Sequence, residues 1–240
     1  PLSRSETSFP AIIDMHHASS LTLEEMRRWG TPSRSGKSER ETKTFELPLP
    51  VASSKGIEET IVKRGSSRRF NGSSVSKAAL ATILASALAD VPIDARAVNK
   101  EALVEAFVIV NAVYDLEPGV YAYDSSTNRL HRSKTGETKD IMSHLALDQS
   151  LGGDAAFNIY FLADLNALLA DLGNRAYRAA HLDASIAAGR AYLAAYSLEL
   201  GATGLTFYDD EVIAYLGEEA KDLSVMFLLA VGNPIPRSSQ

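Results

Sequence analysis

The sequence has no cysteine among its 240 residues. This absence excludes disulfide bridges, thiolate metal sites and a cysteine nucleophile, and it fits a reducing cytoplasm, where we expect the protein to be located. No apolar run approaches the roughly 18 to 20 residues that a membrane span requires. The N-terminus also lacks the basic and then apolar pattern of a signal peptide. We therefore expect no membrane partner.

Basic residues are not in excess either. The formal net charge is −6 and the isoelectric point is about 5.4, whereas a protein that binds nucleic acid through its phosphates needs a basic surface. We therefore expect no nucleic-acid partner. The five histidines show no His-x-x-x-His spacing, which predicts no metal site. Walker-type, Gly-x-Ser-x-Gly and dinucleotide-binding motifs are also absent from the sequence.

The chain is expected to form an arm followed by one domain, which its length allows. Residues 1–50 are the predicted N-terminal arm and linker, in which Thr22 and Glu25 have the spacing of a helix capping box. The single tryptophan, Trp29, is expected to anchor this arm onto the body. Residues 51–240 are the predicted domain.

Within the domain, apolar spacing predicts helices and strands in mixed order. The predicted helices cover residues 57–64, 76–89, 138–147 and 174–200, and the predicted strands cover 106–112, 119–123, 129–132, 156–163 and 223–231. The absence of a regular βαβ alternation predicts an α+β fold. The helix at 174–200 is rich in alanine, so other backbones can approach it closely, and we expect it to lie at the centre.

The segment 64–70 reads Arg-Gly-Ser-Ser-Arg-Arg-Phe and follows a predicted helix. Guanidinium and hydroxyl donors beside a flexible glycine are the groups that a phosphate monoester needs. The same residues also suit a solvated loop, because arginines favour the negative C-terminal end of a helix.

Two further segments follow the predicted central helix. The stretch 200–212 contains Gly201 and Gly204, and is expected to form a turn whose backbone N–H groups could lie against a flat ligand. A helix C-cap followed by an N-cap at Asp209 or Asp210 explains the same residues. The stretch 231–237 reads Val-Gly-Asn-Pro-Ile-Pro-Arg, a strand end that breaks into a turn.

These three segments, in this order, resemble the nitroreductase superfamily of FMN enzymes. The hairpin at 116–124 and the run Arg-Ala-Tyr-Arg at 175–178 resemble its SagB-type branch, which includes azoline oxidases that act on modified peptides. The resemblance covers about residues 50–236. It implies a nitroreductase-like α+β fold with a central, mainly antiparallel sheet, flanking helices and a long central helix.

The resemblance also implies a set of FMN-binding residues. The phosphate and ribityl chain would be contacted by Arg64, Ser66, Ser67 and Arg68, and further flavin contacts would come from Asn99 and Lys100, before the first core strand. The strip beside the flavin ring would be Gly204, Leu205 and Thr206. A further phosphate contact would come from Arg237 near the end of the chain.

The sequence departs from the family pattern at three places. Gly65 replaces a second arginine, and residues 98–101 read Val-Asn-Lys-Glu in place of a Pro-Ser-Gly-Gly-like segment. Asp171-Leu172 replaces the Lys-Tyr pair of azoline oxidases. Neither an ammonium nor a phenol is therefore present at that position to handle a proton, and no side chain is assigned a catalytic role.

The implied function is an FMN-dependent oxidoreductase. It would transfer hydride from NADH or NADPH to an unknown small-molecule acceptor by a ping-pong mechanism, as a homodimer with the flavin at the subunit interface. A degenerate nitroreductase-fold module with a structural or binding role is the alternative. The missing initiator methionine and the polar lead-in are compatible with one half of a tandem protein. An azoline oxidase of peptide modification is the third possibility.

Overall fold

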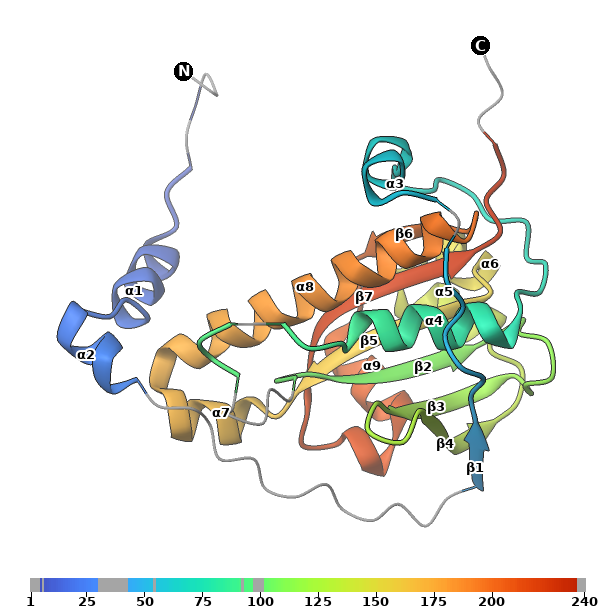
Figure 1. The fold of residues 1–240 in the computed structure, drawn as a ribbon. Helices are drawn as coiled ribbons and strands as arrows, with labels where there is room; N and C mark the ends of the chain where they lie inside the picture. Colours follow the sequence, from blue (N-terminus) through green and yellow to red (C-terminus); the bar gives the residue numbers. More distant parts are fainter. Residues whose placement is uncertain are drawn as a thin grey trace.

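The computed structural model describes residues 5, 7–29, 43–53, 55–91, 93–96 and 102–236. Its strands form a seven-stranded sheet in the order β1-β4-β3-β2-β5-β7-β6, and every neighbouring pair is antiparallel (Figure 1). The strands are β1 (Lys43–Glu46), β2 (Glu105–Val110), β3 (Gly119–Asp124), β4 (Arg129–Thr135), β5 (Phe157–Ala163), β6 (Gly201–Leu205) and β7 (Ser224–Gly232).

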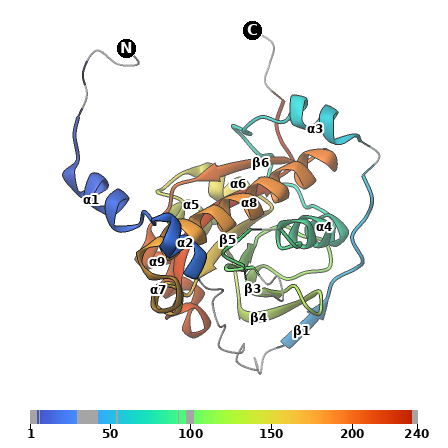
Figure 2. The same cartoon turned by 60° about the vertical axis from the view of Figure 1, so that its left-hand side comes forward.

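Helices cover both faces of this sheet (Figures 1 and 2). The helices are α1 (Pro10–Ala18), α2 (Leu23–Arg28), α3 (Ile57–Lys63), α4 (Lys77–Ala87), α5 (Lys139–Leu145), α6 (Ser150–Asp154), α7 (Leu165–Leu172), α8 (Ala176–Ser197) and α9 (Asp209–Leu216). The capping box predicted for Thr22 and Glu25 is confirmed at the start of α2, and Ser76 caps α4 through the N–H of Ala79. No helix in the described part of the chain is both long and apolar enough to cross a membrane.

The two covered faces explain why the central strands are apolar at successive positions. In β2, Ala106, Val108 and Val110 belong to the core beneath α4 and α8. Phe107 and Ile109 point the other way, into the core beneath α5 and α9. Because successive side chains of a strand alternate between faces, a strand with a core on each side has no polar face.

Helix α8 is the centre of the larger core, as predicted. Its buried positions are alanine except for Asp183, which binds Arg96. The small side chains allow α8 to pack against α4, α7, β6 and β7. In Figure 1 it runs diagonally across the sheet and ends beside β6 and α3.

Four elements differ from the sequence predictions. Strand β1 lies within the predicted arm at 1–50 and pairs with β4; it is short and largely exposed, so it has no clear apolar pattern. Helices α6 and α7 were not predicted. The stretch at 201–205 was predicted as a turn but forms strand β6, because pairing with β7 satisfies its backbone.

The start of α9 also corrects a prediction. The N-cap is Tyr208, not Asp209 or Asp210. Both aspartates lie in the first turn together with Glu211, where carboxylates favour the positive end of the helix dipole.

Candidate functional site

The basic segment at 64–70 crosses the C-terminal end of α8 and is fastened at several points. The backbone N–H of Ser67 donates to the carbonyl of Ala202 in β6 at 3.0 Å. Phe70 is buried and forms a bridge with Pro234, and the N–H of Ile235 donates to the carbonyl of Arg69 at 3.0 Å. The structure therefore brings together the three segments that the sequence singled out.

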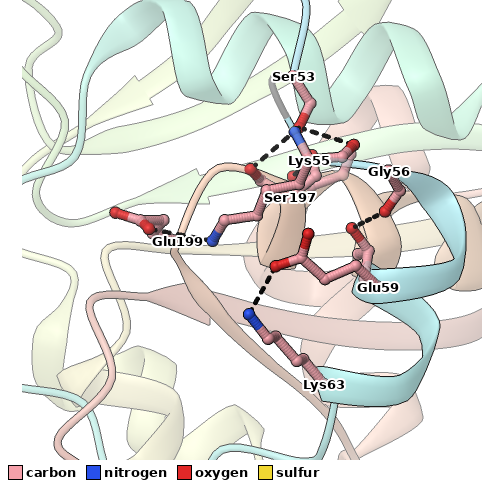
Figure 3. Close-up of polar contacts among 9 residues, drawn as sticks. Ser53, Lys55, Gly56, Glu59, Lys63, Ser197 and Glu199 are labelled. Carbon is pink, nitrogen blue, oxygen red and sulfur yellow. Dashed lines mark hydrogen bonds and ion pairs between the residues drawn. The ribbon is translucent and has the colours of Figure 1, made fainter.

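Helix α3, which leads into this segment, is held to the end of α8. The Lys55 ammonium lies 3.0 Å from the carboxylate of Glu199, and the Ser53 hydroxyl donates to the carbonyl of Ser197 at 3.2 Å (Figure 3). On α3 itself, Lys63 pairs with Glu59 at 2.5 Å. The basic segment thus starts from a position fixed by polar contacts.

A pocket of about 350 Å³ lies beside this segment, within the size range of small-molecule sites. Three basic residues, two serines and one tyrosine contribute to its lining, and none of the lining residues is acidic. The lining consists of Lys63, Gly65, Ser66, Ser67, Arg68, Arg69, Tyr196, Pro234, Ile235 and Pro236.

The donors of this pocket suit a phosphate group. Among the residues that the structure describes, Arg68 and Arg69 form no ion pair, and both are exposed. Uncompensated guanidinium groups beside hydroxyl donors bind phosphate oxygens through charge-assisted hydrogen bonds. The lining therefore fits the anionic end of FMN.

Only some of the predicted FMN-binding residues line the pocket. Ser66, Ser67 and Arg68 line it, whereas Arg64 is not part of the lining and has its guanidinium 5.4 Å from the ring centre of Tyr192. Lys63, Arg69 and Tyr196 line the pocket but were not among the predicted ligands. The predicted ligands Asn99, Lys100 and Arg237 lie outside the described residues.

The predicted strip beside the ring lies at the free edge of the sheet. The carbonyl of Ala202 binds Ser67, so the backbone of Ala202 faces away from β7. Alternate residues of an antiparallel strand direct their backbone groups to the same side, so Gly204 also faces the open edge. Gly204 and Thr206 are exposed and Leu205 is half-buried. The Gly204 carbonyl accepts from the Thr203 hydroxyl at 3.4 Å, so the Gly204 N–H is the backbone group that a flat ligand could use.

A polar cluster that the sequence did not reveal fixes the end of this strip. The two ring nitrogens of His144 lie 2.7 Å from carboxylate oxygens of Asp148 and Glu211, and the Tyr208 hydroxyl donates to Asp148 at 3.0 Å. Hydrogen bonds to Asp148 and then to Glu211 raise the pKa of His144, and the bond from His144 lowers the pKa of Asp148. The spacing of His144 and Asp148 fits a helix, but nothing local indicates Glu211.

The arm meets the body at the end of α7. The Trp29 indole N–H donates to the carbonyl of Leu172 at 3.0 Å, and the Arg175 guanidinium lies 5.5 Å from the Trp29 ring centre. The predicted anchoring role of Trp29 is confirmed. Leu172 is itself buried.

Comparisons with known proteins agree with this architecture. The model described as the nitroreductase family matches residues 61–233. A curated relative from Methanocaldococcus jannaschii, provisionally named a nitroreductase, is 27% identical over 178 residues, which cover 70% of this chain and 88% of the relative.

Two solved structures share the fold. One, from Anabaena variabilis and also provisionally described as a nitroreductase, has a TM-score of 0.78 and 28% identity, covering 92% of this chain and 47% of the other. The chain thus spans about half the length of that protein. The other is a chain of the Escherichia coli microcin synthetase complex, with a TM-score of 0.61 and 16% identity, covering 98% of this chain and 100% of the other. Because the family model matches well over half of the sequence, the chain belongs to the nitroreductase family.

Proposed function

We propose that the protein is an FMN-dependent oxidoreductase that transfers hydride from NADH or NADPH to a small acceptor in a ping-pong cycle. Bound FMN would supply the hydride chemistry, and the protein would supply binding, orientation and electrostatics. The observation that carries the proposal is the pocket at 63–69, whose lining of basic and hydroxyl donors contains no acidic residue and which adjoins the edge strand β6.

Each part of the site has a proposed task. Ser66, Ser67 and Arg68 would hold the phosphate and ribityl chain, with Arg69 and Lys63 adding positive charge. Arg64 would act through the Tyr192 ring that it covers. Gly204, Leu205 and Thr206 would lie beside the flavin ring, and a backbone N–H at the edge would stabilise negative charge on the reduced ring. Asn99, Lys100 and Arg237 are proposed as ligands from the family resemblance.

We also propose a homodimer with the flavin at the subunit interface. Apolar side chains are exposed on the two helices that adjoin the pocket: Leu182 on α8 is 54% exposed, and Ile61 and Val62 on α3 are 51% and 84% exposed. Gly189 on α8 would place a Cβ in open space, so another backbone can approach there. A second copy packed on these helices would remove the apolar groups from water.

Within the family, the hairpin at 116–124 and the run 175–178 support placement in the SagB-type branch, but azoline oxidation is not the activity we propose. The position of the Lys-Tyr pair holds Asp171 and Leu172 at the end of α7, and the Leu172 carbonyl is bound by the Trp29 indole. The ammonium and the phenol that would exchange protons at that point are therefore missing.

The first test is the visible absorption spectrum and mass of whatever co-purifies with the protein, followed by titration with FMN. A bound flavin, reduced by NADH or NADPH, is the expected result. A colourless protein that also fails to bind added FMN would instead favour the degenerate module.

The second test uses a substitution to locate the phosphate-binding part of the site. Arg68→Ala is expected to weaken FMN binding by about 1.5 to 3 kcal/mol, the range for a hydrogen bond to a charged group. Arg129→Ala is the matched control, because Arg129 pairs with Glu46 at the opposite edge of the sheet. Equal FMN affinity in both variants would show that the phosphate is not bound at Arg68.

A further inference from the structure

Two tyrosines on α8 pair with the two serines of the pocket, and one of them, Tyr196, also lines the pocket. Tyr192 and Tyr196 are one helical turn apart, and their rings are stacked with centres 5.7 Å apart and planes 2° apart. The Tyr192 hydroxyl donates to the Ser66 hydroxyl at 2.9 Å, and the Tyr196 and Ser67 hydroxyls lie 3.2 Å apart. Each tyrosine therefore holds one serine, a pairing that none of the FMN-binding contacts above uses.

The direction of these bonds leaves hydroxyl protons for a ligand. A tyrosine or serine hydroxyl has one proton to donate and can also accept. Because Tyr192 donates to Ser66, the proton of Ser66 remains available for an anion. In the second pair either hydroxyl can be the donor, and in both cases one proton is left over. Two donors can thus point at the pocket.

The surroundings keep this arrangement in place before a ligand arrives. Burial raises the pKa of Tyr192, so its hydroxyl stays protonated and remains a donor at neutral pH. The Arg64 guanidinium covers the Tyr192 ring, and Ser67 is buried against Gly201. Donors that are already oriented lose less entropy on binding, and chains of hydrogen bonds strengthen one another.

We propose that Tyr192 and Tyr196 are positioning residues that orient the Ser66 and Ser67 hydroxyls toward the phosphate and so make the site select FMN over unphosphorylated riboflavin. This inference rests on the proposed FMN function. Tyr192 acts through Ser66, and Tyr196, which also lines the pocket, acts at Ser67. Their effect therefore falls on the phosphate end of the ligand and not on its rings.

The test compares two probes, FMN and riboflavin, in Tyr192→Phe, Tyr196→Phe and the double variant. Phenylalanine keeps the stacked rings and removes only the hydroxyl. We expect each single variant to bind FMN about 3- to 10-fold more weakly, the effect of one ordinary hydrogen bond, while riboflavin affinity changes less than about twofold. Tyr177→Phe is the matched control, since Tyr177 lies exposed near the other end of α8.

A double-mutant cycle between Tyr192 and Ser66 gives a second readout. If Tyr192 acts by orienting Ser66, then Ser66→Ala should remove most of the effect of Tyr192→Phe on FMN affinity, because contacting residues are not additive. Independent, additive effects would overturn the positioning role. Measurement of the unfolding temperature of each variant checks that its fold is intact.

The outcomes separate this inference from the proposed function. A wild-type protein that binds FMN, with Phe variants that retain wild-type affinity or lose FMN and riboflavin equally, overturns the inference alone. A wild-type protein that binds neither flavin overturns both. Loss of FMN affinity with riboflavin affinity retained, in the tyrosine variants but not in Tyr177→Phe, supports it.

Discussion

Asp183 offers a sharp test of what holds α8 in the core. Its side chain has 0% exposure and accepts from Nε of Arg96 at 3.0 Å, from Nη2 of Arg96 at 2.7 Å and from the backbone N–H of Leu103 at 2.6 Å. The Arg96 side chain is 2% exposed. Removal of the carboxylate therefore leaves a buried cation and a buried N–H without their acceptor.

The expected cost follows from that burial. Breaking a buried ion pair from one side lowers the free energy of unfolding by about 3 to 5 kcal/mol. Asp183→Asn, which keeps one acceptor oxygen, should lie near the lower figure, and Asp183→Leu near the upper one. For a domain of this size these losses correspond to unfolding temperatures lower by about 6 to 20 °C.

Urea denaturation followed by circular dichroism, with scanning calorimetry, measures the effect. Glu46→Gln is the control, because Glu46 and Arg129 form an ion pair with 78% and 45% exposed side chains. Such a pair contributes about 0.2 to 1 kcal/mol. An Asp183→Asn variant within about 1 kcal/mol of wild type would refute the view that Arg96 depends on this carboxylate.

Three further results are expected. Gly201→Ala would place a Cβ 2.2 Å from the Ser67 hydroxyl oxygen, so it should displace that hydroxyl and weaken FMN binding by roughly tenfold or more, as an FMN titration would show. The raised pKa of His144 means that its carboxylate contacts stabilise the fold below its ordinary pKa of about 6.5 and lose that effect as the pH rises through the raised value; unfolding temperatures of wild type and His144→Ala should converge at alkaline pH. Trp29→Phe removes the donor to Leu172, so limited proteolysis should cleave the arm faster while the domain stays intact.

Local signals predicted most of the elements. The capping box at Thr22 and the cap at Ser76 depend on contacts within four residues, and the turn between β3 and β4 contains polar residues that bind one another. Strand β6 could not be predicted in this way. It is a strand only because β7, more than twenty residues further along the chain, supplies its hydrogen-bond partners.

In the candidate site, too, some residues could be predicted from the sequence and others depend on the tertiary structure. The basic segment at 64–69 and the glycines at 201 and 204 were visible as residue types suited to phosphate and to close approach. Arg69 belongs to that segment and lines the pocket, whereas Tyr196 was not predicted as a pocket residue, because its role depends on where α8 ends relative to the loop. The contact between His144 and Glu211 joins residues 67 positions apart.

The amino-acid sequence by itself determined the helical and strand periodicity, the concentration of donors after α3 and the small residues that let α8 be central. Only the tertiary structure decided which hydroxyl binds which, that Arg64 covers a tyrosine instead of lining the pocket, and that Gly204 faces a free sheet edge. The physical reason is that periodicity and capping act between near neighbours, whereas the site is made of groups that meet only after the sheet and α8 have packed together.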